Sequence, residues 1–384
     1  MFRGDHSPAA FYLALAANFF FFASFQWTFV TLPGYVQQLG GQAAQIGLAI
    51  GLATLSAVLV RPAVGPLVDR WGRKRLLLAG AGLFALEPIL YLLTPEVWPF
   101  LAVRLLRGLG LAAFTTAYTA LVADLAPPAQ RGEALGLAGV TNNLGLLFAP
   151  TLGALVQARW GYPAHFLAAA AIGAASFLTL LPLSAPRSQA EPAVKRIGLW
   201  TVARLRAVQA AALGSTGLAV AYGAVLGFLS PLAADRQLTA AGSYFTAFAL
   251  TMMVCQAVAG WLSDRVGRQA IAVPGLIVAG LATAGLPLAR TDTALLTCGA
   301  GLGLSWGLVR VGLDTAVVDA VPAEGRGSAL GFLYTCFDAG IGVGAFGLGI
   351  IAQAQGYAAT FVVAAFWAAV ALAVFVYRRE RRER

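Results

Sequence analysis

The stretch GPLVDRWGRK, residues 65–74, returns 195 residues later as GWLSDRVGRQ, residues 260–269. Two further matches share this offset. Asp124, Pro127 and the RGxALG of residues 131–136 fall on residues 319–331, and the GYxxxF of residues 161–166 falls on residues 356–361. Shared loop composition cannot hold one register over about 100 residues, so the chain contains two similar halves. The offset is close to half of the 384 residues.

The amino-acid composition indicates that both halves are embedded in a lipid membrane. Hydrophobic residues make up 59% of the chain and charged residues 11%, and the mean hydropathy is +0.77. A soluble domain has about 25% charged residues, which argues against a soluble fold, a nucleic-acid binder and a disordered chain. A spanning helix needs roughly 20 apolar residues. We therefore predict an all-α membrane protein with twelve transmembrane helices in two pseudo-symmetric six-helix halves.

Apolar runs place the twelve helices along the chain. They are expected, within about four residues at each end, at 9–32, 43–66, 75–93, 98–123, 134–157, 164–185, 208–231, 240–261, 269–288, 294–318, 329–352 and 358–377. The first run lacks the short core and small-residue site of a cleavable signal peptide. A polar, Pro-containing stretch separates the sixth run from the seventh. The predicted organisation is an N-terminal half (1–186), a cytoplasmic linker (187–207) and a C-terminal half (208–384).

Basic residues predict the orientation of the chain in the membrane. With a cytoplasmic N-terminus, 19 Lys and Arg fall in cytoplasmic regions and three, Arg159, Arg236 and Arg290, fall outside. The positive-inside rule therefore places both termini in the cytoplasm of a bacterial-type inner membrane. The net charge of +10 follows from these loops and gives no reason to expect a nucleic-acid partner.

The repeated stretch resembles the signature loop of the major facilitator superfamily, and the resemblance covers the whole chain. It implies that this loop braces helix 2 against helix 11 and gates the conformational switch. The alternative is that its arginines only determine the orientation of the chain in the membrane. Gly65 is expected to allow close helix approach and Gly72 a tight turn. The candidate gating residues are Gly65, Asp69, Arg70, Gly72 and Arg73, with Gly260, Asp264, Arg265, Gly267 and Arg268 in the second copy.

Two further motifs resemble the drug:proton antiporter branch of that superfamily. Arg104-x-x-Arg107-Gly-x-Gly looks like its helix-4 motif, whose arginine lies near the substrate and proton path; Arg104 matches that arginine, and Arg107 replaces a glutamine. Gly145-x-x-x-Ala-Pro150-x-x-Gly153-Ala is similar to its helix-5 antiporter motif, with two glycines changed to alanine. Small residues at these positions still permit tight helix packing. The resemblance favours export over import.

Ionisable residues inside apolar segments are costly and usually functional. Glu87 is expected either to pair with Arg104 or Arg107 or to reach the outer headgroups. Arg310 and Asp314, four residues apart, can pair on one helix face. The candidate proton-coupling residues are therefore Asp338, Asp314 and Glu87, and the candidate charged cavity residues are Arg61, Arg104, Arg107 and Arg310.

Depth makes Asp338 the leading proton-coupling candidate. It lies nine residues into its helix, about 13 Å from the inner face, and Arg61 and Arg310 fall at about 12 and 13 Å. In the fold that the chain resembles, helices 2 and 11 face each other, so Asp338 could pair with Arg61 or with Arg310. The repeat partner of Asp338 is Asn143. An acid present in one half only suits a proton switch, and the alternative is a permanent ion pair.

Uncharged polar residues within the apolar segments complete the candidate cavity. They are Asn18, Gln26, Tyr118, Asn142, Asn143, Tyr222 and Gln256. The aromatic residues Phe19–Phe22, Phe25 and Trp27 either stack on substrate or contact lipid. The scattered Cys255, Cys298 and Cys336 indicate neither a disulfide framework nor a zinc site. His6 and His165 form no metal cluster or catalytic triad.

These observations predict a secondary transporter and no enzyme. The chain contains no Walker loop or nucleophile elbow, so we expect no cofactor and an ion gradient as the energy source. The predicted activity is proton-coupled efflux of a small amphipathic or zwitterionic molecule by alternating access. We expect the protein to be a monomer whose partners are this substrate, protons and membrane lipid. One alternative is proton-coupled uptake of an organic anion, favoured by the buried arginines. Another is a non-transporting sensor or lipid-handling scaffold, which would have no need of carboxylates at midplane depth.

Overall fold

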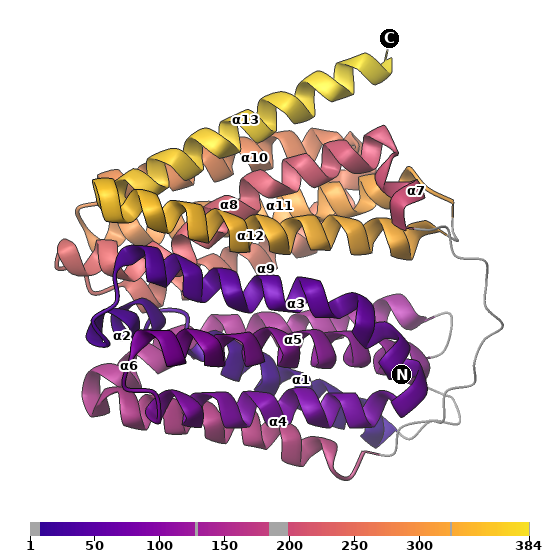
Figure 1. The fold of residues 1–384 in the computed structure, drawn as a ribbon. Helices are drawn as coiled ribbons and strands as arrows, with labels where there is room; N and C mark the ends of the chain where they lie inside the picture. The colour runs from indigo at the N-terminus through magenta and orange to yellow at the C-terminus, as the bar shows by residue number, and fades with distance from the viewer. Residues whose placement is uncertain (1–7, 127–129, 184–198, 323–324, 384) are drawn as a thin grey trace. The chain divides into compact units, whose positions relative to one another are not determined.

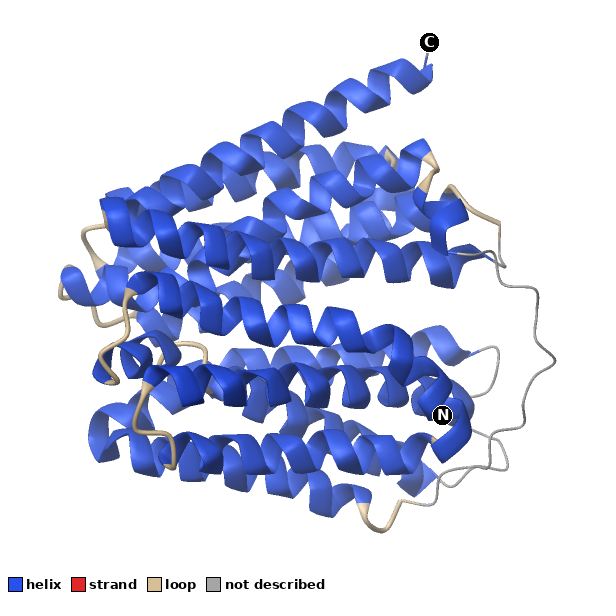
Figure 2. Cartoon of the chain, viewed as in Figure 1, coloured by secondary structure: helices blue, strands red, loops and turns tan. Residues whose placement is uncertain are grey.

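The computed structural model describes residues 8–126, 130–183, 199–322 and 325–383 and is built of helices, with no strand in these ranges (Figure 2). Figure 1 shows long helices joined by short loops. In chain order they are α1 Pro8–Trp27, α2 Leu32–Gln38, α3 Ala43–Trp71, α4 Arg73–Leu92, α5 Val97–Leu125, α6 Arg131–Leu180, α7 Leu199–Ala203, α8 Arg206–Asp235, α9 Ala241–Val266, α10 Arg268–Gly285 with a 3-10 turn Leu286–Leu288, α11 Asp292–Asp319, α12 Arg326–Gln355 and α13 Tyr357–Glu383.

Helix α6 is two membrane crossings joined at one residue. It is 50 residues long, which at 1.5 Å per residue is about 75 Å and more than twice the bilayer core. Gly161 interrupts it with φ 77° and ψ 179°. Eleven helices of the described ranges are long and apolar enough to span a membrane, and α6 is one of them. Counting α6 twice gives the twelve crossings that the sequence predicted.

The first predicted helix, 9–32, is wrong at its C-terminal end. Helix α1 ends at Trp27, residues 28–31 form a turn, and the short helix α2 follows. Pro33 explains the break, because proline has no N–H to continue the α1 ladder and is favoured in the first turn of a new helix. We call residues 28–31 the α1–α2 corner.

The backbone repeats with the offset seen in the sequence. Gly72 separates α3 from α4 with φ 85°, and Gly267 separates α9 from α10 with φ 97°. Gly161 and Gly356, with φ 77° and 84°, form the second pair at the same offset. Side chains other than glycine rarely adopt these angles, so each pair marks a turn that both halves retain.

The chain divides into two compact units. Unit 1 is Met1–Gly41 with Leu52–Gln189, and unit 2 is Gln42–Gly51 with Ala190–Arg384. Most of the predicted linker, up to residue 198, lies outside the described residues, and its later part contains α7 and the first residues of α8. The boundaries 1–186, 187–207 and 208–384 remain a prediction.

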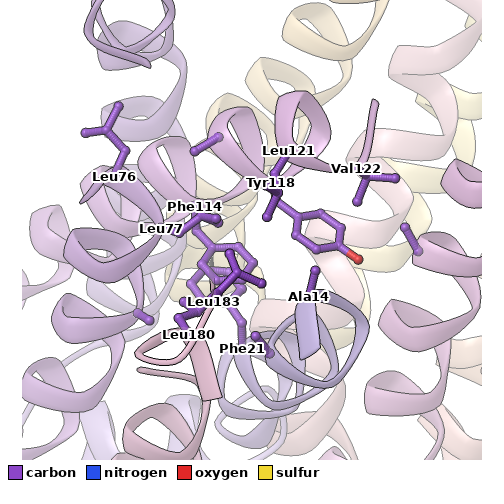
Figure 3. Packing of buried hydrophobic residues seen from close by; sticks show 14 of the residues in the cluster. Ala14, Phe21, Leu76, Leu77, Phe114, Tyr118, Leu121, Val122, Leu180 and Leu183 are labelled. Carbon is purple, nitrogen blue, oxygen red and sulfur yellow. The ribbon is translucent and has the colours of Figure 1, made fainter. Parts of the chain in front are cut away.

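Unit 1 has an aromatic and aliphatic core between α1, α4 and α5. Phe21 is fully buried and stacks on Phe114 at 3.7 Å between ring centroids (Figure 3). Leu77, Leu121 and other apolar side chains surround this pair. Phe21 therefore packs in the core, and neither of the two roles expected for the phenylalanine run applies to it.

The outward surface is apolar along the helices and carries tryptophan near helix ends. Leu59 on α3 and Leu281 on α10 are 77% and 67% exposed. Trp71, Trp98, Trp160 and Trp261 are each more than half exposed and lie near a helix end or at the α6 break. Tryptophan prefers the boundary between lipid and water, so this pattern fits helices that span a bilayer.

Candidate functional site

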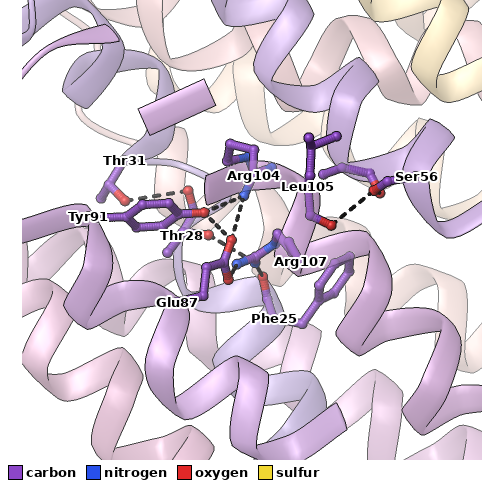
Figure 4. Close-up of polar contacts among 10 residues, drawn as sticks. Phe25, Thr28, Thr31, Ser56, Glu87, Tyr91, Arg104, Leu105 and Arg107 are labelled. Atoms are coloured by element: carbon purple, nitrogen blue, oxygen red, sulfur yellow. Dashed lines mark hydrogen bonds and ion pairs between the residues drawn. The ribbon is translucent and has the colours of Figure 1, made fainter. Parts of the chain in front are cut away.

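A buried ionic cluster lies in unit 1, where α4 and α5 pack as an antiparallel hairpin around residues 93–96. Glu87 and Tyr91 occupy one face of α4, and Arg104 and Arg107 occupy the facing side of α5 (Figure 4). Antiparallel packing pairs the residues nearest the turn, Tyr91 and Arg104, and then the next pair, Glu87 and Arg107. We call these four residues the Glu87 cluster.

Both carboxylate oxygens of Glu87 have partners. Arg107 Nη1 donates to Oε2 at 2.8 Å, and Tyr91 donates its hydroxyl hydrogen to Oε1. Arg104 Nη1 lies 3.5 Å from Oε1 and donates to the Tyr91 hydroxyl at 3.0 Å. The Glu87 side chain is 0% exposed. The predicted pairing of Glu87 with Arg104 or Arg107 is therefore confirmed, and the alternative contact with outer headgroups is wrong.

Arg107 connects this cluster to the end of α1. Its Nη2 donates to the Phe25 carbonyl and to Thr28 Oγ1, the latter at 3.1 Å. Its guanidinium also lies over the Phe25 and Phe84 rings, at 4.9 and 5.2 Å. A cation at the C-terminal end of a helix satisfies carbonyl groups that lack intrahelical partners and favours the helix dipole. Arg107 thus braces α1 against α4 as well as neutralising Glu87.

The Glu87 cluster carries more positive than negative charge. Two arginines, with side chains 6% and 3% exposed, face one glutamate. Tyr35 on α2 donates its hydroxyl hydrogen to the Tyr91 carbonyl at 2.9 Å. A phenol is a hydrogen-bond donor at neutral pH, and burial raises the pKa of Tyr35 further. The cluster is therefore a closed, hydrogen-bonded, cationic site.

Unit 2 contains a second, more accessible ionic group on α11 and α12. Arg310 Nη2 lies 3.5 Å from Asp314 Oδ2, which also accepts a hydrogen bond from the Tyr334 hydroxyl at 3.0 Å. Asp314 Oδ1 is buried and has no hydrogen-bond partner among the described residues. The Arg310 and Asp314 side chains are 21% and 26% exposed, so this pair is reached more easily than Glu87.

Four aromatic rings adjoin that group, and the sequence prediction missed three of them. Trp306 lies one helical turn before Arg310 and contacts Tyr222, Phe337 and Phe248 at centroid distances of 4.7, 5.2 and 5.6 Å. The Arg310 guanidinium lies over the Tyr334 ring at 4.3 Å. These rings come from α8, α9, α11 and α12, so only the fold brings them together. We call Arg310, Asp314 and Tyr334, with the rings of Tyr222, Phe248, Trp306 and Phe337, the Asp314 cluster.

The other predicted charged residues are half-buried. Asp338 follows Phe337 on α12, and Arg61 lies on α3 next to Pro62. The pairing of Asp338 with Arg61 or Arg310 remains a prediction. Gln256 on α9 and Asn143 on α6 are also half-buried, and their roles remain predictions as well.

The predicted polar residues of α1 contact α6. Asn18 Nδ2 donates to the Ala138 carbonyl at 3.1 Å and to Thr141 Oγ1 at 2.7 Å. Gln26 Nε2 donates to Asn142 Oδ1 at 3.0 Å. Tyr118 is buried on α5 and stacks on Phe114. These contacts place Asn18, Gln26 and Asn142 in the α1–α6 interface of unit 1.

The motif of Gly145, Pro150 and Gly153, predicted for the fifth membrane helix, lies on α6 and allows α6 to approach α1. A Cβ at Gly153 would lie 2.4 Å from the Trp27 carbonyl oxygen, and one at Gly145 would lie 2.8 Å from Gln26 Oε1. The contact at Gly153 is to backbone, which cannot move aside, so this packing requires that glycine; at Gly145 the contact is to the end of a flexible side chain, and the nearest backbone atom, Ala23 N, is at 3.0 Å. Pro150 is buried in α6 between them.

The loop motif is described only in part. The side chains of Asp69, Asp264 and Arg268 lie outside the described residues, and Arg70 and Arg265 are exposed. Arg73 Nε donates to Asp124 Oδ2 at 2.9 Å, which ties the start of α4 to the end of α5.

Two glycines of this loop, Gly65 and Gly72, were expected to have different roles. A Cβ at Gly65, or at Gly260 in the second copy, would meet nothing within 4 Å in the described part of the chain. The close helix approach expected at Gly65 remains a prediction. Gly72 adopts the positive φ that a tight turn requires.

No group of three His, Cys, Asp or Glu side chains in the described ranges could hold a metal ion.

Comparison with known proteins gives consistent matches over the whole length. The family model described as Major Facilitator Superfamily matches residues 14–311 and 211–384. The chain is 24% identical over 360 residues to MJ1560 of Methanocaldococcus jannaschii, named an uncharacterized MFS-type transporter, covering 90% of the chain and 92% of that protein. It is 27% identical over 358 residues to the multidrug resistance protein MdtG of Salmonella typhimurium, covering 89% and 88%. A bacterial homolog of the human lysosomal transporter Spinster, inward-facing and occupied, superposes with a TM-score of 0.85 at 14% identity, covering 99% of the chain and 98% of that structure.

Proposed function

The chain belongs to the Major Facilitator Superfamily and is an integral membrane transporter, not an enzyme, and from that premise we propose that it exports small amphipathic molecules in exchange for protons. The multidrug resistance name of a relative similar over 89% of the chain supports this substrate class. Members of the family bind small-molecule substrates and usually act as monomers, and we infer both for this chain.

The Asp314 cluster carries the proposal. It combines a carboxyl group, a guanidinium and several aromatic rings within spanning helices. Aromatic faces bind flat apolar groups and cations, and a carboxylate adds attraction for a positive charge. A flat molecule that carries a cationic or zwitterionic group fits this chemistry.

Asp314 is better placed than Glu87 to exchange a proton. Each oxygen of Glu87 accepts a hydrogen bond inside a closed cluster, so protonation would break contacts to Tyr91 and the arginines. Asp314 Oδ1 is buried without a donor from the described ranges, and an ionised oxygen in that state is costly. Asp338 remains the second candidate, on the depth argument that first singled it out.

Proteoliposomes test the assignment with ethidium, a flat hydrophobic cation, as the probe. We expect Asp314→Asn to retain ethidium exchange and to lose accumulation driven by a pH gradient. Asp338→Asn is the matched variant, one helix away. Accumulation that survives in Asp314→Asn and is lost in Asp338→Asn would move the coupling role to Asp338. If the wild-type protein does not accumulate ethidium under any gradient, the export proposal is wrong for this substrate class.

The excess positive charge of the Glu87 cluster favours a second candidate function, proton-coupled uptake of an organic anion. An anionic substrate group would balance the second arginine. Fluorescein, an organic anion of size similar to ethidium, distinguishes the two candidates in the same vesicles. Accumulation of fluorescein in the direction of proton entry, with no movement of ethidium, would favour uptake.

We also propose that both termini face the cytoplasm, as the distribution of basic residues indicates. A single cysteine added near residue 380 of a chain whose three native cysteines are replaced should react with a membrane-impermeant maleimide in everted vesicles and not in intact cells. The reverse pattern would invert the topology.

A further inference from the structure

His165, which the sequence placed without a role, is fully buried where the α6 break meets the α1–α2 corner. It lies four residues after Gly161 and is 0% exposed. Its Nδ1 lies 2.9 Å from the Gly153 carbonyl oxygen, and its Nε2 lies 2.9 Å from Thr31 Oγ1. Its own carbonyl accepts a hydrogen bond from Trp27 Nε1 at 3.1 Å. One residue thus connects α1, the corner and both arms of α6.

The partners of the ring define its tautomer. The Gly153 carbonyl can only accept, so Nδ1 carries the hydrogen. In the neutral ring Nε2 is then an acceptor and takes the hydrogen of the Thr31 hydroxyl. Both ring nitrogens therefore form hydrogen bonds, each with a different segment. Nδ1 donates to Gly153 in the first arm of α6, and Nε2 accepts from Thr31 in the α1–α2 corner.

The corner is held from the α6 side at one residue. Besides the His165 contact to its hydroxyl, Thr31 accepts a hydrogen bond at its carbonyl from the Tyr162 hydroxyl at 3.2 Å. The single Thr31 hydroxyl hydrogen is used by His165, so the link to Thr28 runs through the backbone, where the adjoining Leu32 amide donates to the Thr28 carbonyl at 3.0 Å. The position of Thr28 therefore depends on the position of Thr31.

Arg107 is held by the opposite side of the same corner. Its Nη2 donates to Thr28 Oγ1 and to the Phe25 carbonyl, while Nη1 donates to Glu87. His165 and Arg107 thus both contact the short segment of residues 25–31, one at Thr31 and the other at Phe25 and Thr28. All of these residues belong to unit 1.

We propose that His165 is a positioning residue for Arg107. By holding Thr31, its Nε2 fixes the corner that keeps the Arg107 guanidinium against Glu87, and transport depends on that geometry. The Nδ1 bond to Gly153 serves a different purpose, since it fastens the two arms of α6. The transport readout of this inference rests on the proposed function, whereas the contact chain does not.

Two amide variants separate the nitrogens. The side-chain amide introduced by His165→Gln reaches the position of Nε2 and can accept from Thr31. The shorter amide introduced by His165→Asn lies near the position of Nδ1, so it bonds Gly153 but does not reach Thr31. We expect His165→Gln to keep ethidium transport within about twofold of wild type. His165→Asn should lower the maximal rate about tenfold, the effect of one buried hydrogen bond.

Variants of Thr31 give the matched control. Thr31→Ser keeps the hydroxyl and should transport as wild type, and Thr31→Val should lower the rate as His165→Asn does. The double variant His165→Asn/Thr31→Val should be no slower than either single variant, since both remove one contact. Thermal unfolding in detergent, measured for each protein, shows whether a lower rate reflects a lower folded fraction. Equal rates for the two His165 variants, or a wild-type rate for Thr31→Val, would overturn the proposal.

A measurement without substrate keeps the inference testable if the protein does not transport ethidium. His165→Asn, Arg107→Lys and the double variant are unfolded by titration with SDS in mixed micelles. If both residues act through the same corner, their effects on stability are not independent. The fold-change in the unfolding equilibrium constant of the double variant should then differ at least about twofold from the product of the two single fold-changes. Purely multiplicative effects would show that His165 does not position Arg107, whatever the substrate.

Discussion

Replacing Glu87 with glutamine tests whether the Glu87 cluster is a permanent ion pair. The change keeps the size of the side chain and removes its charge, so two guanidinium groups with side chains 6% and 3% exposed lose their counter-charge. Removing one partner of a buried ion pair costs about 3–5 kcal/mol. That corresponds to roughly two to nearly four orders of magnitude in the folding equilibrium constant. A structural pair therefore predicts a large loss of stability.

The assay is unfolding by SDS titration in mixed micelles, followed by the fluorescence of the eight tryptophans. The double variant Glu87→Gln/Arg104→Gln is the control, because it restores the native difference of one positive charge within the cluster. It should be more stable than Glu87→Gln alone, although it has lost one more ionic contact. Arg107 is kept in both proteins because it also holds α1.

A loss of less than about 1 kcal/mol, the range of an exposed ion pair, would refute this reasoning. Glu87 would then be held as a neutral acid in the folded protein, and it would replace Asp314 as the first candidate for proton coupling. The stability measurement thus bears directly on the assignment of the proton site.

Three further predictions concern the motifs. Gly153→Ala places a Cβ 2.4 Å from the Trp27 carbonyl oxygen and should cost about 1–3 kcal/mol in the same unfolding assay, and an unchanged midpoint would contradict the close α1–α6 packing. Arg104→Lys removes the planar fork beside Glu87 and should lower the rate of ethidium transport at least about tenfold, whereas a wild-type rate of Arg104→Ala would exclude Arg104 from the coupling path. Asp69→Asn should reduce transport strongly at normal expression, while Asp264→Asn in the second copy should reduce it less; equal and small effects would leave both loops a topological role only.

Sequence patterning was sufficient for the helices because lipid imposes a simple rule. A segment of about 20 apolar residues has to span the membrane as a helix, whatever its neighbours. The offset of 195 residues also predicted which turns recur, and Gly72 and Gly267 confirm it in their backbone angles. The end of the first helix was missed because the apolar run continues through Thr28 to Leu32, and only Pro33 signals the break.

Side-chain partners were harder to predict because they depend on the rotation of each helix about its axis. The sequence showed that Glu87 lies in a helix next to that of Arg104 and Arg107, and it left open whether these side chains face each other. Trp306 and Phe248 look like ordinary membrane residues until the fold places them in one cluster with Arg310. His165 gave no signal at all, since its two partners are a carbonyl group and a threonine hydroxyl, which no spacing rule identifies.

The two copies share their glycine turns and differ in where they place charge. At the offset of 195 residues, Glu87 and Arg104 correspond to Ala282 and Gly299, while Arg310 and Asp314 correspond to Thr115 and Thr119. Those two threonines donate to carbonyls of their own helix. A chain made of two copies of the same half would keep the two shared pairs of glycine turns and would lose one of the two ionic clusters. Neither half contains the charged group of the other, so the two halves are not interchangeable in the charge that they place within the membrane.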